Sequence, residues 1–334
     1  MEGTRFCERV EDHPGPERCA EGMMRQPITK PLQIEWLPRV PAADNARTRL
    51  PKLVVAYFAE GRKLLKSNPA PADLHALRLA TKKVRSGLVN FRHVLEDIET
   101  LNRKATEGAY DLTAISYHAY AYVADKYVLM ASGSSVGDGY GPILVSTRPM
   151  APEEIKGKRI AIPGRMTTAY LALRLFEPDF EEVPIPFDKI LDAVAEHSVD
   201  AGLIIHEGQL TYGKSGFQNI VDLGRWWKTT YDLPLPLGAN ALLRTLHGEI
   251  KGECCRLMRE SIQYALDHGE ESLNYALQFA RDLEPRLAEK FVGMYVNHHT
   301  LDGGEIVPQA AQKLLDLGYE AGLITNKVEV EFVR

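Results

Sequence analysis

The chain has 334 residues, 45% of them hydrophobic and 25% charged, a balance typical of a globular protein that buries a sizeable core. A formal net charge of -5 and a pI near 6.1 give no basic footprint for nucleic acid. No stretch reaches the roughly 18 to 20 apolar residues of a membrane span. The charged first 25 residues do not read as a secretory signal peptide, so we expect a cytoplasmic protein without nucleic-acid or membrane partners.

The cysteines and the N-terminal region carry no chemical motif. Two cysteines lie in the first 20 residues and Cys254 adjoins Cys255, so no CxxC spacing exists and we expect reduced thiols and no metal site. Nine of the 20 prolines precede Ala72. Residues 1–60 are therefore expected to form a poorly ordered extension, with one strand-like run at Leu53–Phe58.

From about residue 61 onward, alternating helix and strand signals predict a mixed α/β architecture. Two units share one layout, with predicted helices over Val94–Glu107 and Phe187–Val194 and predicted strands over Leu112–Ile115 and Ala201–Ile205. A polar residue follows each strand, Ser116 in the first unit and His206 in the second. Open α/β sheets bind ligands at such strand ends, so we expect two related lobes that face one cleft.

Between these units lies a candidate anion site. A strand over Arg159–Ile162 is followed by a glycine turn, by Thr167 and Thr168, and by an apolar helix over Ala169–Phe176. Free backbone N–H groups at a helix start bind anions, and a threonine hydroxyl adds a donor. The alternative is that the threonines only cap the helix. Further along, residues 253–297 are expected to form consecutive helices, the last of them opened by Pro285.

His206 is the strongest candidate for catalysis. It follows two branched apolar residues and precedes Gly208, which should end the strand. A neutral imidazole at a cleft-facing strand end suits general acid–base work, although a histidine that merely packs there fits the pattern too. If the strand continues past His206, Glu207 points to the opposite face and is less suited to act with His206. Ser116 and His118 could bind a polar substrate group, but Ser116 could equally cap a helix.

Two other segments have structural explanations. Gly137–Pro142 is glycine-rich but lacks the spacing of a nucleotide-binding loop, and we predict a crossover between lobes there. The pair Trp226–Trp227 is expected to cover the core, with a cleft-lining ring as the alternative.

Several blocks resemble the 1,4-dihydroxy-6-naphthoate synthase family of futalosine-route menaquinone biosynthesis. They are VLEDIETLNRKATEGAYDLTAISYHAYAYV from Val94, GDGYGPILVS from Gly137, GRMTTAYLALRLF from Gly164, VDAGLIIHEGQLTYGKSGFQNIVDLGRWWKTTYDLPLPLGAN from Val199 and YVNHHTLDGGE from Tyr295. The resemblance implies an α/β, two-lobed periplasmic-binding-protein-like type II fold. We assign lobe I to residues 61–147 plus 236–334 and lobe II to residues 148–235.

The same resemblance implies a chemistry. Members convert cyclic de-hypoxanthine futalosine to 1,4-dihydroxy-6-naphthoate and dihydroxyacetone, a carbon–carbon lyase reaction on a small-molecule substrate without metal or organic cofactor. By the family's pattern His206 is the catalytic base, and Ser116, Thr168 and Ala169 match positions that line the substrate pocket. Two alternatives stay open: chorismate dehydratase of the same pathway, and a non-catalytic solute-binding protein.

The first pocket loop departs from the family. Its counterpart, Asn68–Asp73, keeps two prolines and the substrate-binding aspartate, Asp73, but lacks the first acidic position and the aromatic residues that follow. A diverged active loop, a lost activity and a damaged reading frame over residues 74–79 are the three explanations that remain.

Overall fold

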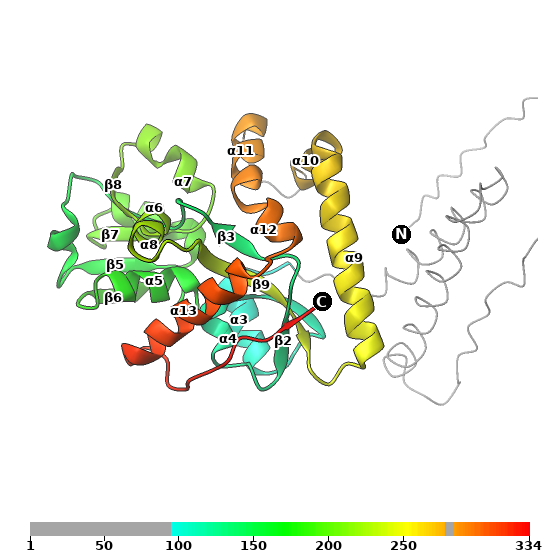
Figure 1. Ribbon diagram of the computed structural model, residues 1–334. Coiled ribbons are helices and arrows are strands. Elements are labelled where there is room, and N and C mark those ends of the chain that lie inside the picture. The colour runs from blue at the N-terminus through cyan, green and yellow to red at the C-terminus, as the bar shows by residue number, and fades with distance from the viewer. Residues whose placement is uncertain (1–94, 278–283) are drawn as a thin grey trace, which may run out of the picture. The chain divides into compact units, whose positions relative to one another are not determined.

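The computed structural model describes residues 95–277 and 284–334 (Figure 1). The chain divides into two compact units, residues 1–87 and 88–334, and the described residues all belong to the second. The predicted extension over residues 1–60, the strand-like run at Leu53–Phe58 and the pocket residue Asp73 lie outside the described residues. Two five-stranded sheets organise the second unit, which makes its architecture α/β as predicted.

The first sheet is built around its longest strand, β9. Its order is β1 (Leu112–Ser116), β9 (Leu235–Leu243), β2 (Tyr127–Met130) and β10 (Phe332–Val333), and β3 (Ser135–Gly137) also pairs with β9. Strands β1, β2 and β3 all run antiparallel to β9. Ser116 lies opposite Gly238 in the register, so the end of β1 meets the middle of β9.

The second sheet has the order β6 (Glu181–Pro184), β5 (Arg159–Ile162), β7 (Ala201–Ile204), β4 (Ile143–Ser146) and β8 (Gln218–Asp222). β5 is parallel to β6 and β7, whereas β4 is antiparallel to β7 and β8. Both β4 and β7 are buried along their whole length, which fits their largely apolar sequences, although β4 ends on the buried Ser146.

The crossover predicted at Gly137–Pro142 is confirmed, because it joins β3 of the first sheet to β4 of the second. The boundary placed at residue 147 puts β4 with lobe I, yet β4 pairs only within the second sheet. Its continuous apolar run gave no local sign of which sheet it joins, because pairing partners are distant in the chain. The rest of the lobe assignment stays a prediction.

Helices occur where periodicity predicted them, over 94–107, 169–176 and 187–194 and within 253–297, with differences at their ends, and the structure adds others that were not predicted. They are α3 (Ile98–Thr106), α4 (Tyr117–Tyr120), α5 (Thr168–Phe176), α6 (Ile190–Ala195), α7 (Gly208–Thr211), α8 (Leu223–Tyr231), α9 (Gly248–Asp267), α10 (Gly269–Ala276), α11 (Pro285–Tyr295), α12 (His298–Leu301) and α13 (Ile306–Glu320). Short 3₁₀ turns occupy Pro152–Ile155, Phe187–Lys189 and Tyr212–Ser215. Among the described helices, none combines the length and apolar character needed to cross a membrane.

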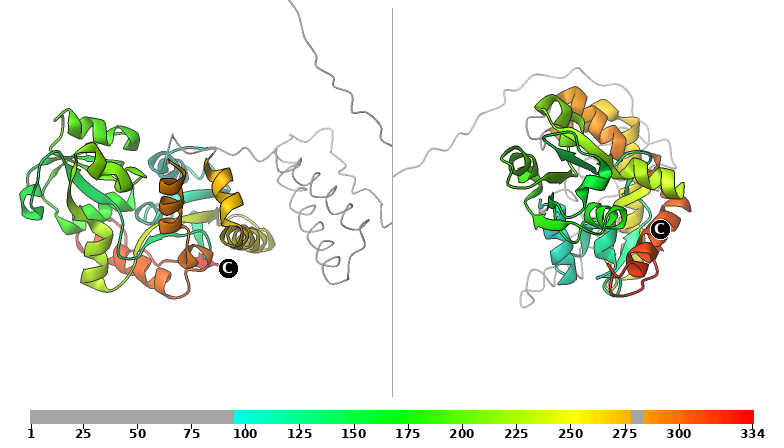
Figure 2. Two further views of the ribbon diagram at one scale, coloured as in Figure 1. Left: turned by 90° about the horizontal axis from the view of Figure 1, so that it is seen from above. Right: turned by 90° about the vertical axis from the view of Figure 1, so that its left-hand side faces the viewer.

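Two views show how these elements surround the sheets. In Figure 1 and in the left view of Figure 2, the second sheet with α5–α8 lies to one side and α9–α12 to the other. Helix α13 packs against both α5 and β9, and one core cluster includes residues of both sheets. Trp227 is fully buried in that cluster and Trp226 packs against it, so the prediction that this pair covers the core is confirmed.

Candidate functional site

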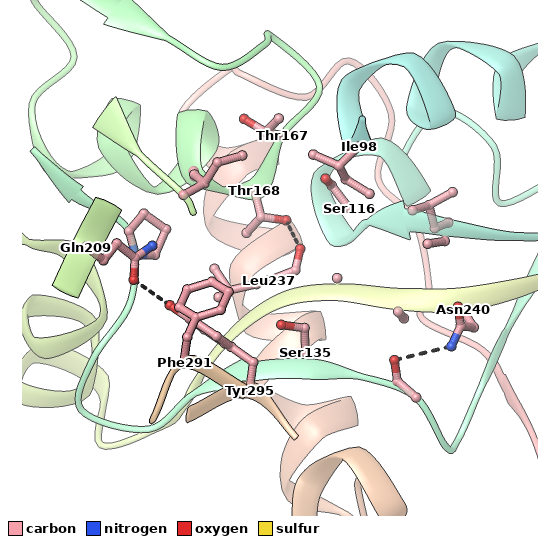
Figure 3. Close-up of a pocket in the computed structure, with 18 residues that line it drawn as sticks. Ile98, Ser116, Ser135, Thr167, Thr168, Gln209, Leu237, Asn240, Phe291 and Tyr295 are labelled. Carbon is pink, nitrogen blue, oxygen red and sulfur yellow. Dashed lines mark hydrogen bonds between the residues drawn. The ribbon is translucent and has the colours of Figure 1, made fainter. Parts of the chain in front are cut away.

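A cavity of about 320 Å³ is lined by strand residues of the first sheet and by residues that flank the strands of the second sheet. Its polar side chains include Ser116, Ser135, Thr168, Gln209, Asn240 and Tyr295 (Figure 3). Apolar groups such as Ile98, Leu237 and Phe291 cover much of the remaining wall, and none of the described residues that line it is charged. Such a surface suits a ligand with a large apolar face and a few polar groups that fix its orientation.

Three of the predicted substrate-binding residues come together here. Ser116 at the end of β1 and Thr168 and Ala169 at the start of α5 all line the cavity. His206 is not among the lining residues, although Ile205 and Gln209 on either side of it are. The family resemblance carried Ser116, Thr168 and Ala169 to one place, but their role in binding substrate stays a prediction.

The start of α5 is held by its own threonines. Thr167 is the N-cap, and its hydroxyl accepts a hydrogen bond from the Tyr170 amide at 3.2 Å. The Thr168 hydroxyl donates to the Leu237 carbonyl at 2.7 Å and accepts from the His118 amide at 3.2 Å. The protein thus engages the Thr168 hydroxyl on both sides, which differs from our expectation that it would be offered to an anion.

The backbone amides of Thr168 and Ala169 remain available to bind an anion. They belong to the first turn of α5, where N–H groups have no partner within the helix. No described residue accepts a hydrogen bond from either amide. Because both residues line the cavity, these two N–H groups are the ones that can meet an anionic group there.

Asn102 of α3 joins the two sides of this wall. Its fully buried side chain accepts from the Ser116 amide at 2.8 Å and donates to the Ser116 hydroxyl at 3.0 Å and the Met166 carbonyl at 3.3 Å. Ser116 occupies the N-cap position of α4, as the alternative expected, but its hydroxyl makes no capping hydrogen bond to that helix. One turn earlier, the Glu99 carboxylate accepts from the Met166 amide at 3.0 Å, and burial raises the pKa of Glu99.

His118 lies behind the wall rather than in it. Its Nδ1 lies 3.3 Å from the Thr167 carbonyl and its Nε2 3.3 Å from the Tyr122 hydroxyl. A carbonyl can only accept, so the neutral ring carries its proton on Nδ1. Burial lowers the pKa of His118 to about 4, which keeps the ring uncharged near neutral pH.

His206 sits in the turn between β7 and α7. Its Nδ1 accepts a hydrogen bond from the Gly208 amide at 3.0 Å, and its ring meets Phe187 with centroids 5.7 Å apart. The side chain is 17% exposed. Gly208 lacks room for a side chain, since an added Cβ would lie 2.6 Å from His206 Cε1.

The chain leaves the sheet earlier in this turn than predicted, so the condition under which Glu207 would face away from His206 is not met. The strand ends at Ile204, and Gly208 begins a short helix rather than ending the strand. Glu207 adopts a helical backbone conformation, which brings its Oε2 to 3.9 Å from His206 Nδ1 instead of placing it on the opposite face. Strand alternation no longer applies once the chain has left the sheet.

Gln209, Tyr295, Asn102 and Asn240 were not predicted as site residues. They come from distant elements, and the only signal for them is that all four lie in the family-like blocks. Among the described residues, no group of three or more His, Cys, Asp or Glu side chains could hold a metal ion. Cys254 and Cys255 are free thiols, and burial raises the pKa of Cys255 to about 11.

Comparison with known proteins places these features in a family. A 1,4-dihydroxy-6-naphthoate synthase of Thermus thermophilus is 44% identical over 266 residues, which cover 80% of this chain and 97% of that protein. The crystal structure of an Archaeoglobus fulgidus protein is 49% identical, with a TM-score of 0.67 over 70% of this chain and 87% of that chain.

An alkanesulfonate-binding protein of Xanthomonas axonopodis matches with a TM-score of 0.55 and 17% identity, over 70% of this chain and 83% of that one. At that identity the likeness shows the fold alone, and the fold is periplasmic-binding-protein-like, as the resemblance implied. The family model described as menaquinone biosynthesis matches residues 72–320, beginning inside the departing loop. Since this match spans well over half of the 334 residues, the chain belongs to the menaquinone biosynthesis family.

Proposed function

We propose that this protein is a 1,4-dihydroxy-6-naphthoate synthase, which converts cyclic de-hypoxanthine futalosine to 1,4-dihydroxy-6-naphthoate and dihydroxyacetone. The observation that carries the proposal is the 44% identity to the Thermus synthase over nearly its whole length. The cavity supports it, because Ser116, Thr168 and Ala169 share one wall and the other surfaces are largely apolar. An aromatic carboxylic acid fits such a site, with its ring on the apolar wall and its carboxylate at the open amides.

The proposed reaction is a carbon–carbon lyase reaction that begins with proton abstraction, followed by ring opening, retro-aldol-type cleavage and aromatisation. His206 is proposed as the base. Its Nδ1 accepts from the Gly208 amide, so the step requires the ring to leave that bond and turn toward the cavity. Ile205 already lines the cavity one residue away, which makes the required movement a local one.

Glu207 supports this assignment electrostatically. Its carboxylate lies 3.9 Å from His206 Nδ1, where a negative charge favours the imidazolium that forms when the ring takes up a proton. Both side chains are partly shielded, with 17% and 32% of their surfaces exposed. We further propose a cytoplasmic enzyme whose partner is this small molecule, not nucleic acid or a membrane.

Product analysis with purified cyclic de-hypoxanthine futalosine tests the proposal. We expect 1,4-dihydroxy-6-naphthoate and dihydroxyacetone in equal amounts, with no product from chorismate under the same conditions. Turnover of chorismate instead would assign the chain to the dehydratase. Binding of the futalosine compound without turnover, in calorimetry at enzyme concentrations that detect slow reactions, would favour a solute-binding protein.

A further inference from the structure

A hydrogen bond joins two residues of the cavity lining to which the proposed mechanism gives no role. The Tyr295 hydroxyl at the end of α11 donates to the Gln209 side-chain carbonyl at 2.7 Å (Figure 3). The two residues are 86 positions apart, and both line the cavity. Each lies in one of the blocks that carry the family resemblance, so this bond joins two of those blocks.

Gln209 connects this bond to the turn that carries His206. Its side-chain amide also donates to the carbonyl of Ile204, the last residue of β7, at 3.2 Å. Its backbone amide donates to the His206 carbonyl at 2.9 Å. Gln209 is only 8% exposed, so water has little access to replace these hydrogen-bond partners. Gln209 thus bonds both Ile204, where the segment 204–209 leaves the strand, and His206 within it.

Tyr295, the donor of this hydrogen bond, is itself held in place by several contacts. Its ring meets Phe291 and Tyr140 edge to face, with centroids 5.2 Å and 5.7 Å away. Its backbone carbonyl accepts from the Thr300 hydroxyl at 2.8 Å. Burial raises the pKa of Tyr295, so the phenol stays neutral and remains a donor throughout the physiological range.

We propose that Gln209 and Tyr295 are positioning residues, which act through the turn to hold His206 in reach of the cavity. The inference rests on the proposed function, because it assigns the residues to the base of that reaction. Without the Tyr295 bond, Gln209 is held only from the His206 side of the cavity. The turn then keeps its local bonds but loses its tie to the wall where the substrate would lie.

Steady-state kinetics of Tyr295→Phe, Gln209→Met and the double variant test this assignment. Each single variant should lower kcat about 3- to 10-fold, the range expected for one hydrogen bond, with KM within twofold of the parent. The double variant should match Gln209→Met, because Tyr295 is proposed to act only through Gln209. Additive losses, or a raised KM with unchanged kcat, would show that Tyr295 contacts the substrate itself and would overturn the inference.

Tyr140→Phe is the matched control. The Tyr140 hydroxyl donates to the carbonyl of Met294, which lies in α11 next to Tyr295. It makes no hydrogen bond to the segment 204–209 among the described residues. Its loss should leave kcat within twofold of the parent. An equal loss of kcat in Tyr140→Phe would mean that α11 merely needs its hydroxyl contacts for stability.

A second readout does not depend on turnover. Imidazole ¹⁵N spectra of the parent, assigned for His206 by the signals missing in His206→Asn, should change at His206 in Tyr295→Phe but not in Tyr140→Phe. Unchanged His206 signals in Tyr295→Phe would overturn the inference whatever the substrate. A parent that fails to convert cyclic de-hypoxanthine futalosine, yet shows the expected spectral change, would refute the proposed function and leave the positioning intact.

Discussion

Two histidines, His118 and His206, each lie close to a strand end that borders the cavity, yet their surroundings differ. His118 is 2% exposed, both of its ring nitrogens face polar groups of the protein, and its pKa is lowered to about 4 by burial. His206 lies in a turn, 17% exposed, beside a carboxylate and a glycine without room for a side chain. A base that must take up a proton near neutral pH fits the second environment and not the first.

The largest effect is expected from replacing His206. His206→Asn should lower kcat about 100- to 10,000-fold, the usual contribution of a general base. The variant should fold and bind substrate, since the asparagine carboxamide oxygen can accept the Gly208 amide hydrogen bond in place of Nδ1. Rates of product formation and calorimetric binding would measure both. If kcat falls only a few-fold, the base lies elsewhere, and the buried His118 is no longer the natural second candidate.

The next prediction is that buried His118 makes the free energy of unfolding depend on pH. Unfolded chains bind a proton at His118 below about pH 6.5, whereas the folded protein binds it only near pH 4. The neutral ring therefore contributes stability above pH 6.5 that is lost as pH falls to about 4, in total about 3 kcal/mol. Urea unfolding at several pH values should show this loss in the parent.

His118→Asn should flatten that pH dependence, because the amide keeps a donor toward Thr167 but does not titrate. Thr230→Val is the control, since this exposed side chain carries no titratable group and its replacement leaves the slope to the parent's groups. The same slope in all three proteins would contradict a buried, neutral His118.

Gly208→Ala sharpens the comparison by moving the His206 ring without removing it. The added methyl would lie 2.6 Å from Cε1, so the ring must shift, and misplaced catalytic groups can cost up to about 100-fold in rate. We expect kcat to fall about 10- to 100-fold. The melting temperature should stay equal or rise, because alanine favours α7 more than glycine does.

Gly213→Ala provides its control, because a Cβ there would meet no atom within 4 Å. That variant should retain the parent's kcat. Equal rates in Gly208→Ala and the parent would show that the ring position seen here does not matter for the reaction.

The smallest effect tests the wall in front of His118. Thr168→Val removes a hydroxyl that bonds both Leu237 and the His118 amide, and the unpaired buried groups should cost about 1 to 3 kcal/mol of unfolding free energy. The exposed Thr230, whose hydroxyl bonds the Trp226 carbonyl, serves as control, and Thr230→Val should stay within about 0.5 kcal/mol. If Thr168→Val is as stable as the parent but has a raised KM, the Thr168 hydroxyl binds substrate rather than stabilising the fold.

Much of the fold was predictable because helices and strands leave local periodic patterns in the sequence. The strand over Arg159–Ile162 has the predicted bounds, and α5 begins one residue before the predicted start. The helix expected over 187–194 divides into a 3₁₀ turn and α6, a difference at the ends that local patterns do not resolve. Strand β4 was placed with the wrong lobe because its pairing partners, β7 and β8, lie far along the chain.

The sequence by itself determined the α/β alternation, the glycine crossover and, through its family-like blocks, the set Ser116, Thr168 and Ala169. The sequence also ranked His206 above His118 as a candidate base. Only the tertiary structure showed how different the surroundings of the two rings are, because the groups that pack against each ring come from distant parts of the chain. It also revealed that Asn102 bonds Met166 across 64 positions and that Gln209 bonds Tyr295 across 86. Side-chain hydrogen bonds between distant segments leave no periodic trace, since one residue on each side is enough to make them.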